Sequence, residues 1–401
     1  MQSIAVVGAS LAGVTAAEAL REEGFDGVIT LVGQESCLPY DRPPLSKQAI
    51  QGAEQVEPAG LRTRAELDAL DVRLRLGVRA SSLAPASAGG RHRIGLADGD
   101  RLDVDGVILA TGARARSLPF TEPATGVHLL RTYGDAVGIR RDFERRPRVV
   151  VVGAGFLGME VAASARAHDL DVTVLEAADL PMVGPLGRTL GRWAEAVHRQ
   201  RGVRLMCGVQ VAGFVGTTRL QGLVLADGTL IEADMAVVAV GAEPNTAWLD
   251  GSGIEFDGGV VCDEHCATRV DGIFAAGDVA RYFSPRMGKR VRSEHWANAV
   301  EQGRVAARNL LRPRDRWDAC QAVPYFWSDQ YDVKIQFVGE RLPDQEAELV
   351  EGSYESGRFG VVFRHGDTVT GAMAANLPAF AAKHRRLLKS RYAATTTQGR
   401  F

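Results

Sequence analysis

Apolar runs of a few residues alternate along the chain with glycine-rich turns and alanine-rich amphipathic stretches. Residues 4–7 form one such run, the turn at 8–13 reads GASLAG, a helical pattern covers 14–23, and a second apolar run covers 28–32. A strand, a glycine turn, a helix and a second strand form the opening of a Rossmann fold. The N-terminal pattern therefore predicts one dinucleotide-binding unit.

The same order of elements returns in mid-chain. The valines at 149–152 lead into the turn GAGFLG at 153–158, and a helical pattern at 159–168 precedes the apolar run 172–176. From about residue 324 the pattern changes to aromatic and alternating segments, which are typical of an antiparallel sheet. We therefore expect an α/β fold with two Rossmann-like dinucleotide-binding domains and a C-terminal α+β domain.

Composition narrows the class of protein. A chain of 401 residues exceeds the size of one hydrophobic core, and its 45 glycines exceed the usual share of roughly 7%. Its 47 basic and 49 acidic residues give a net charge of −2, which provides no general attraction to nucleic acid or to a membrane. Five scattered cysteines favour a reducing compartment, and we find neither a signal peptide nor an apolar run of the roughly 20 residues that span a bilayer. We expect a cytoplasmic protein.

The two glycine turns carry the chemistry of pyrophosphate binding. In such a turn the first glycine allows the tight bend, the second lets backbone amides approach the phosphates, and the third lets the helix pack on the strand. The N-terminus of the helix adds unpaired N–H groups and a partial positive charge. The first turn has Gly8 and Gly13, with Ser10 at the second position; the other has Gly153, Gly155 and Gly158. Two such turns predict two bound dinucleotides.

An acidic residue at the end of the second strand should bind the adenosine ribose. In mid-chain this residue is Glu176, which would accept hydrogen bonds from both ribose hydroxyls and would repel a 2′-phosphate. The pattern therefore predicts NADH rather than NADPH. For the first turn Glu35 is the best candidate, and a merely solvated Glu35 is the alternative.

Several longer segments occur in an order that is typical of one family. These segments are GASLAG, LPYDRPPLSK, the strand end ATG, GAGFLGME, AVGAEPN, IFAAGDVA, SEHWANAVEQG and PYFWSDQYD. The chain resembles the FAD-dependent, NADH-using ferredoxin reductases that supply bacterial oxygenases, within the glutathione-reductase-like flavoproteins. The resemblance implies an FAD domain in two parts, 1–112 and 242–320, an NADH domain at 113–241 and a C-terminal domain at 321–401.

The resemblance also implies roles for individual residues. Lys47 would lie beside the reactive N5 of the flavin, and Glu160 would pair with this lysine across the nicotinamide pocket. Trp327 would either flank the flavin or belong to the core of the third domain. Further FAD contacts would come from Arg42, Thr111, Gly112, Gly277, Asp278, His295 and Trp296. Further NADH contacts would come from Phe156, Leu157 and Gly241.

The electron acceptor is inferred by exclusion and by resemblance. Disulphide reductases need a pair of closely spaced cysteines beside the flavin, and no C-x-x-C or C-x₄-C motif is present. The reduced flavin must then pass its electrons outward, and the resemblance implies a 2Fe-2S ferredoxin that supplies a P-450 or Rieske oxygenase. Other acceptors (rubredoxin, a quinone or oxygen) and a redox-sensing NADH-binding protein of the apoptosis-inducing-factor type are the alternatives. No metal site is expected.

One basic cluster precedes the segment SEHWANAVEQG. It consists of Arg281, Arg286, Lys289, Arg290 and Arg292. Because small ferredoxins are usually acidic, complementary charge would speed their encounter with this cluster. The alternative is a set of solvated arginines.

Overall fold

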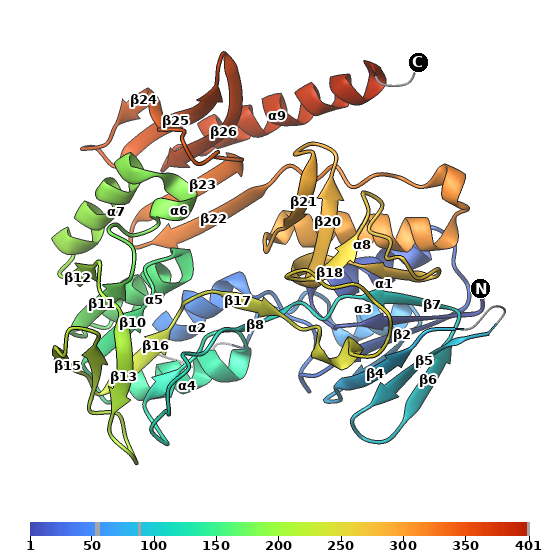
Figure 1. Cartoon of the computed structure of the whole chain (residues 1–401), viewed down its shortest axis with the longest axis horizontal. Coiled ribbons are helices and arrows are strands. Elements are labelled where there is room, and N and C mark those ends of the chain that lie inside the picture. The colour runs from blue at the N-terminus through green and yellow to red at the C-terminus, as the bar shows by residue number, and fades with distance from the viewer. Residues whose placement is uncertain (53–56, 87–89, 399–401) are drawn as a thin grey trace. The chain divides into compact units, whose positions relative to one another are not determined.

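The computed structural model describes residues 1–52, 57–86 and 90–398. The chain divides into two compact units, and each is assembled from three separate segments (Figure 1). The first unit comprises Met1–Asp41, Ala59–Arg114 and Glu243–Pro324, and the second comprises Arg42–Pro58, Ala115–Ala242 and Tyr325–Phe401. The strands β8 (Ala113–Ala115) and β17 (Ala242–Pro244) pair with each other where the chain passes between the units.

A five-stranded parallel sheet forms the centre of the first unit. Its order is β19-β7-β1-β2-β3, and every neighbouring pair is parallel. Nearly all residues of β1, β2, β7 and β19 are buried, which explains why these strands are continuous apolar runs in the sequence. The strands are β1 (Ser3–Val7), β2 (Val28–Gly33), β3 (Val72–Leu76), β7 (Gly106–Leu109) and β19 (Ile273–Ala275).

Two helices pack against each other in the first unit, α1 (Leu11–Glu22) and α8 (Trp296–Leu311) (Figure 1). They approach closely at Gly303, where an added Cβ would lie 2.6 Å from the Ala12 carbonyl oxygen. The remaining elements are short. They are α3 (Arg64–Ala69), the antiparallel sheet β4 (Ala80–Ala84), β5 (His92–Leu96) and β6 (Arg101–Val104), and the sheet β18 (Val260–Cys262), β20 (Ala280–Ser284) and β21 (Lys289–Arg292).

The second unit repeats this plan. Its parallel sheet has the order β12-β11-β10-β16-β9, so that in both units the strand before the glycine turn is central. In each unit an antiparallel three-stranded sheet comes in the sequence just before a strand that pairs with the central one, β7 in the first unit and β16 in the second. The elements are β9 (Val127–His128), α4 (Tyr133–Phe143), β10 (Val149–Val152), α5 (Phe156–Ala167), β11 (Val172–Glu176), α6 (Val183–Leu186), α7 (Arg188–Gln200), β12 (Arg204–Cys207), β13 (Val211–Val215), β14 (Gly222–Leu225), β15 (Leu230–Glu232) and β16 (Met235–Val238).

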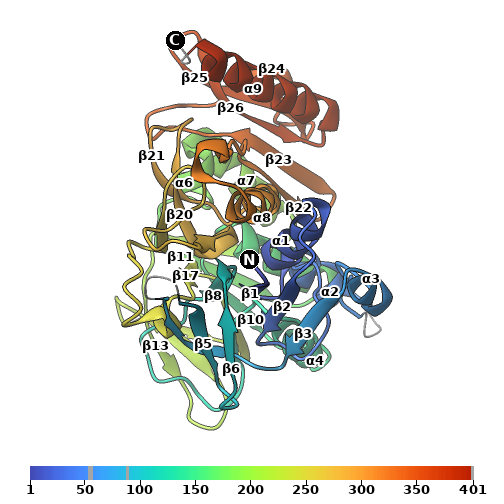
Figure 2. The ribbon, with the colours of Figure 1, turned by 90° about the vertical axis from the view of Figure 1, so that its right-hand side faces the viewer.

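The C-terminal segment of the second unit forms a five-stranded antiparallel sheet on which α9 packs (Figure 2). Its order is β22-β23-β26-β25-β24. The elements are β22 (Tyr325–Gln330), β23 (Val333–Gly339), β24 (Glu348–Ser353), β25 (Arg358–His365), β26 (Thr368–Ala375) and α9 (Pro378–Gln398). The predicted fold class, with two Rossmann-like sheets and a C-terminal α+β part, is confirmed.

The proline-rich segment belongs to the second unit although its sequence neighbours belong to the first. It forms the short helices η1 (Pro43–Ser46) and α2 (Gln48–Gln51), which lie against α5. The Ser164 hydroxyl donates to the Ser46 carbonyl oxygen at 2.7 Å, and Gln51 donates to Ser164 at 2.9 Å. The predicted division into four segments did not include this exchange and stays a prediction. No helix in the described part of the chain is long and apolar enough to cross a membrane.

Candidate functional site: two glycine turns and a buried ion pair

Two of the mid-chain glycines are required by the fold itself. Gly153 has a φ of +102°, and a Cβ there would lie 2.5 Å from the Ala239 carbonyl oxygen. A Cβ on Gly158 would lie 2.0 Å from the Gly153 carbonyl oxygen. Both distances are far below a van der Waals contact, so the turn and the packing of α5 on β10 exclude any side chain at these two positions.

Packing does not explain why the middle residue of the turn, Gly155, is a glycine. It caps α5 with an ordinary φ of −75°, it is exposed, and a Cβ on it would meet no atom within 4 Å. Its neighbour Leu157 is 38% exposed although it is a large apolar residue. Nothing in the described protein therefore requires a glycine here, whereas a phosphate approaching the N-terminus of the helix would require one.

Glu176 ends β11 and turns its carboxylate toward the glycine turn. Oε2 accepts from the Ala154 N–H at 2.6 Å, and Oε1 accepts from the Ala178 N–H at 2.8 Å. The side chain is half-buried, so it retains access to a ligand. These two bonds fix the carboxylate beside the turn, where the sequence predicted a ribose contact. That contact stays a prediction.

The N-terminal turn repeats the two glycines that packing requires. A Cβ on Gly8 would lie 2.0 Å from the Ala110 carbonyl oxygen, and one on Gly13 would lie 1.8 Å from the Gly8 carbonyl oxygen. Ser10 occupies the position of the middle glycine and caps α1 with an extended backbone. The N-terminal turn therefore tolerates a small side chain at a position where the mid-chain turn has none.

The acidic candidate of the N-terminal turn is also placed differently. Glu35 lies two residues beyond β2, and its carboxylate accepts from the Tyr40 hydroxyl at 2.5 Å. Glu35 is therefore held by a neighbour, although its expected contact with a ribose stays a prediction.

Other predicted FAD contacts of the first unit lie at the ends of β7 and β19. Thr111 donates to the Asn245 carbonyl oxygen at 2.9 Å, and Gly112 accepts from the Asn245 N–H at 2.9 Å. Gly277 has a φ of +78° and follows β19, and Asp278 beside it is half-buried. These residues lie at the carboxyl ends of parallel strands, which is where ligands bind in open α/β sheets.

His295 and Trp296 lie at the start of α8. Burial lowers the pKa of His295 to about 4, although the charge of Asp278 partly opposes this shift, so the imidazole is neutral at neutral pH. Trp296 is 39% exposed, and its indole N–H donates to Asp41 at 3.0 Å. A large aromatic side chain at the surface of the unit is available to a ligand or a partner.

Two amides on α8 have buried atoms that lack a hydrogen bond. Gln302 accepts from the Gly277 N–H at 2.8 Å through Oε1, but its Nε2 has no partner among the described residues. Asn298 donates to the Ser293 carbonyl oxygen at 3.0 Å, while its Oδ1 also lacks a partner there. Buried polar atoms are normally bonded, so these two atoms could hold a bound group at this place. Gln302 lies within the segment SEHWANAVEQG, but no role was predicted for it from the sequence.

Lys47 and Glu160 form a buried ion pair in the second unit. Lys47 Nζ lies 2.9 Å from Glu160 Oε2, and the two side chains are 8% and 7% exposed. Lys47 also donates to the Pro43 carbonyl oxygen at 3.1 Å, and the Ser46 hydroxyl donates to Glu160 Oε2 at 2.5 Å. The structure therefore brings together two residues that the family resemblance paired across 113 positions of the sequence. Ser46 lies within the segment LPYDRPPLSK, but roles were predicted from the sequence only for Arg42 and Lys47 of that segment.

The remaining predicted residues make other contacts. Arg42 donates to the Arg131 carbonyl oxygen within the second unit. Phe156 packs edge-to-face on Phe326 with centroids 4.6 Å apart. Trp327 is half-buried on β22 and lies 6.1 Å from Tyr325, ring to ring. Their expected contacts with a nucleotide stay predictions.

The basic cluster lies on β20, β21 and the turn between them. Arg281 pairs with Asp257 at 2.8 Å and Arg292 pairs with Glu294 at 2.6 Å, whereas Lys289 and Arg290 are exposed. The charges of Arg281 and Arg292 are therefore partly balanced by acidic neighbours. The use of this cluster as a docking surface stays a prediction.

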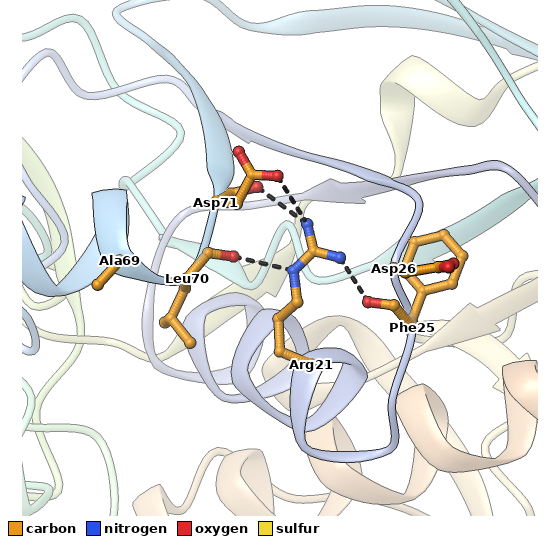
Figure 3. A pocket seen from close by; sticks show the side chains of 6 residues that line it. All are labelled: Arg21, Phe25, Asp26, Ala69, Leu70 and Asp71. Atoms are coloured by element: carbon orange, nitrogen blue, oxygen red, sulfur yellow. Dashed lines mark hydrogen bonds and ion pairs between the residues drawn. The ribbon is translucent and has the colours of Figure 1, made fainter.

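A surface pocket beside α1 has a structural role. Its centre is Arg21, which donates to the carbonyl oxygens of Phe25 at 2.5 Å, Leu70 at 2.9 Å and Asp71 at 3.0 Å (Figure 3). The guanidinium therefore joins the C-terminal end of α1 to the start of β3. We do not assign a ligand to it.

All five cysteines are free thiols. Burial raises the pKa of Cys207 to about 11 and that of Cys262 further, and a hydrogen bond with Cys320 raises the pKa of Cys266. These three thiols are therefore not thiolates at neutral pH. In the part of the chain that the structure describes, no group of three or more His, Cys, Asp or Glu residues is arranged to hold a metal ion.

Comparisons with known proteins agree with this architecture. Residues 2–303 match the family described as pyridine nucleotide-disulphide oxidoreductase, and residues 325–399 match a reductase C-terminal domain. The chain is 36% identical over 399 residues to rhodocoxin reductase of Rhodococcus erythropolis, covering 99% of this chain and 91% of that protein. It is 37% identical to the ferredoxin–NAD(+) reductase component of the anthranilate 1,2-dioxygenase system of Burkholderia cepacia, covering 96% and 93%.

A solved structure is similar over nearly the same length. The covalent putidaredoxin reductase–putidaredoxin complex matches with a TM-score of 0.89 at 33% identity, covering 97% of this chain and 93% of that one. The chain therefore belongs to the pyridine nucleotide-disulphide oxidoreductase family.

Proposed function

We propose that this chain is an FAD flavoenzyme that oxidises NADH and passes the electrons singly to a 2Fe-2S ferredoxin, which supplies an oxygenase. Relatives that match more than nine-tenths of the chain include ferredoxin–NAD(+) reductase components of the anthranilate 1,2-dioxygenase and p-cumate 2,3-dioxygenase systems. The observation that carries the proposal is the pair of glycine turns, each after the central strand of its own parallel sheet. Bound FAD accepts two electrons as hydride and releases them one at a time.

The residues at both turns fit two dinucleotides. The open space at Gly155 suits the pyrophosphate of NADH, and the fixed carboxylate of Glu176 suits hydroxyls of its ribose. In the first unit, Asn298 Oδ1 and Gln302 Nε2 are buried and provide an acceptor and a donor for a bound FAD. The protein thus contributes one permanent site and one exchangeable site.

The ion pair supplies a fixed positive charge for hydride transfer. Glu160 holds the Lys47 ammonium group by a direct contact of 2.9 Å, and the Ser46 hydroxyl holds the same carboxylate oxygen. A buried cation is costly unless it is paired and hydrogen-bonded, and here both conditions are met. We infer that Lys47 presents its charge where negative charge grows during the reaction.

Three of the five thiols are unsuited to the chemistry of a disulphide reductase. The pKa values of Cys207, Cys262 and Cys266 are raised, so they do not provide the low-pKa thiolate of a disulphide reductase. We infer that electrons leave for an external carrier. We also propose that the protein acts in the cytoplasm, which is consistent with its five free cysteines.

The substitution Lys47→Ala tests the hydride-transfer role. It should leave FAD bound and slow flavin reduction by NADH about a hundredfold in stopped flow, the low end of what one electrostatic or acid–base group contributes. Lys334→Ala is the matched control, since Lys334 is exposed on β23 and pairs with Asp329 at 3.1 Å. An unchanged rate of flavin reduction in Lys47→Ala would rule out the role.

The acceptor needs a separate assay. Steady-state NADH oxidation should rise strongly when a purified 2Fe-2S ferredoxin is added, and rubredoxin, a quinone or oxygen alone should support much less. Rapid oxidation with oxygen alone, without any increase on adding ferredoxins, would contradict the proposal. Slow turnover with NADH-driven dimerisation would instead favour a redox-sensing protein.

A further inference from the structure

A second serine contacts Glu160 from the opposite side of the ion pair. The Ser328 hydroxyl on β22 donates to Glu160 Oε1 at 2.6 Å, whereas Lys47 and Ser46 occupy Oε2. Both carboxylate oxygens are therefore bonded. Ser328 comes from the C-terminal sheet, so Glu160 is held by two segments that are far apart in the sequence.

Ser328 is the last member of a network of buried, hydrogen-bonded polar groups. Gln330 Nε2 donates to the Ser328 hydroxyl oxygen at 3.0 Å, and Gln330 Oε1 lies 2.9 Å from His198 Nε2 on α7. The Tyr331 hydroxyl lies 3.0 Å from His198 Nδ1. Gln330 is 2% exposed, and Ser328 and His198 are fully buried. These groups consequently depend on one another for their hydrogen bonds.

The protonation states of His198 and Tyr331 determine which group donates and which accepts in every hydrogen bond of this network. Burial lowers the pKa of His198 to about 4 and raises that of Tyr331 to about 12, so at neutral pH the imidazole carries one proton and the phenol keeps its own. Since Gln330 Oε1 can only accept, His198 Nε2 carries the proton and Nδ1 accepts from Tyr331. Ser328 then accepts from Gln330 and has its single proton available for Glu160.

The neighbouring residue on the same strand does not take part. Asp329 lies between Ser328 and Gln330, so in a β-strand its side chain points to the opposite face. It pairs there with the exposed Lys334. The alternation therefore separates a buried network on one face of β22 from an exposed ion pair on the other.

We propose that His198 and Gln330 are positioning residues, which orient the Ser328 hydroxyl toward Glu160 and thereby fix the ammonium group of Lys47. They touch neither substrate nor cofactor in this proposal and act only through Ser328 and Glu160. The importance of this network for catalysis rests on the proposed function, but the positioning of Lys47 can be measured independently of that function.

Lysine reactivity provides this measurement. The chain has five lysines, of which Lys47 is buried and the other four, Lys289, Lys334, Lys383 and Lys389, are exposed. Limited labelling of the holoenzyme with an amine-reactive reagent, quantified by mass spectrometry, therefore reports the protection of Lys47 against four internal standards. The variants are Gln330→Met, which removes both amide bonds, and His198→Phe, which leaves Gln330 Oε1 unsupported.

In both variants labelling of Lys47 should rise about tenfold, since a hydrogen bond to a charged group is lost or misdirected. Labelling of the other four lysines should not change. His198→Gln restores an amide N–H near the position of Nε2 and should return the protection of Lys47 toward that of the unmodified protein. Asp329→Asn is the matched control, because it removes the charge that pairs with the already exposed Lys334 and should leave Lys47 protected.

Wild-type labelling of Lys47 in both Gln330→Met and His198→Phe would overturn the proposal. If either variant fails to fold, as judged by its melting temperature and retained flavin, Ser328→Ala removes the last bond of the chain and must raise the labelling by a similar factor. Stopped flow with the same variants should show slower flavin reduction at saturating NADH with little change in NADH affinity. A normal flavin reduction rate in Lys47→Ala would refute the catalytic role while leaving the labelling result intact.

Discussion

The two glycine turns have the same backbone plan and differ at one position. In both, the first and third glycines are required because a Cβ would lie between 1.8 and 2.5 Å from a carbonyl oxygen. The middle position is Ser10 in one turn and Gly155 in the other, and no protein atom lies within 4 Å of a Cβ at position 155. Packing therefore explains the first and third glycines of each turn, whereas Gly155, in open space at the N-terminus of α5, is explained by a ligand that approaches the helix.

The largest expected effect concerns the glycines that packing demands. Gly13→Ala and Gly158→Ala should each cost more than about 3 kcal/mol of unfolding free energy, since neither helix can move away without leaving its strand. Chemical unfolding or the yield of folded protein measures this. Gly213→Ala, where a Cβ would meet nothing within 4 Å, is the control. A small effect at Gly13 together with a large one at Gly158 would show that the two turns are not equivalent.

Acid sensitivity should differ between the two units. Each contains a histidine whose pKa burial lowers to about 4, fully buried His198 in the second unit and partly exposed His295 in the first. In the unfolded chain these histidines bind a proton at a higher pH than in the folded protein. Their contribution to the free energy of unfolding is therefore fully present above about pH 6.5 and is lost as the pH falls toward 4. For His198 the loss amounts to about 3 kcal/mol.

Unfolding curves at several pH values between 4 and 6.5 check this expectation. His198→Gln should flatten the dependence by nearly one proton. His295→Gln should flatten it less, because that side chain is partly in contact with solvent. An equal or larger change for His295 would reverse the assigned difference between the units.

The next effect concerns the two acidic residues. Glu176→Ala should weaken NADH binding by about 2 kcal/mol and leave NADPH binding nearly unchanged, because a ribose contact and a repulsive charge disappear together. Glu176→Arg should go further and favour NADPH. The ratio of kcat/KM for the two nucleotides measures the change. Glu35→Ala should leave this ratio unchanged. A shift of similar size in Glu35→Ala would show that the assignment of Glu176 to NADH and of Glu35 to FAD is wrong.

The smallest effect tests the middle position of each turn. Gly155→Ala should change the unfolding free energy by less than about 0.5 kcal/mol but raise the KM for NADH about tenfold, since the methyl group occupies space meant for phosphate. Ser10→Gly should leave FAD retention and NADH kinetics unchanged. Normal NADH kinetics in Gly155→Ala would show that the open space is not the nucleotide site.

The sequence predicted those parts of the fold whose signal is local. Apolar runs followed by glycine turns identified β1, β10 and the helices after them, because a parallel strand buried on both faces is a continuous apolar segment. The C-terminal antiparallel sheet was predicted from another local signal, the alternation of apolar and polar residues. The paired Lys47 and Glu160 came from family resemblance, since no local rule joins residues so far apart.

Other features depend on contacts that leave no local mark. Residues 42–58 pack in the second unit through hydrogen bonds such as that between Ser164 and Ser46. The pattern of apolar and polar residues in the sequence does not predict such bonds. The same holds for His198, which reads as an ordinary residue of an amphipathic helix. Its role appears only when α7 and β22 are brought together and bury it beside Gln330.

The interleaving of the segments has a consequence for biosynthesis. All strands of the mid-chain parallel sheet lie between residues 127 and 238, whereas the N-terminal sheet includes β19 at Ile273–Ala275 and its α1 packs on α8. As the chain leaves the ribosome, the mid-chain sheet therefore completes its strands first, while β7 and α1 of the N-terminal unit still lack their later partners β19 and α8. Nascent chains stalled before Ile273 should resist protease in mid-chain sooner than at the N-terminus, and the opposite order of protection would contradict this expectation.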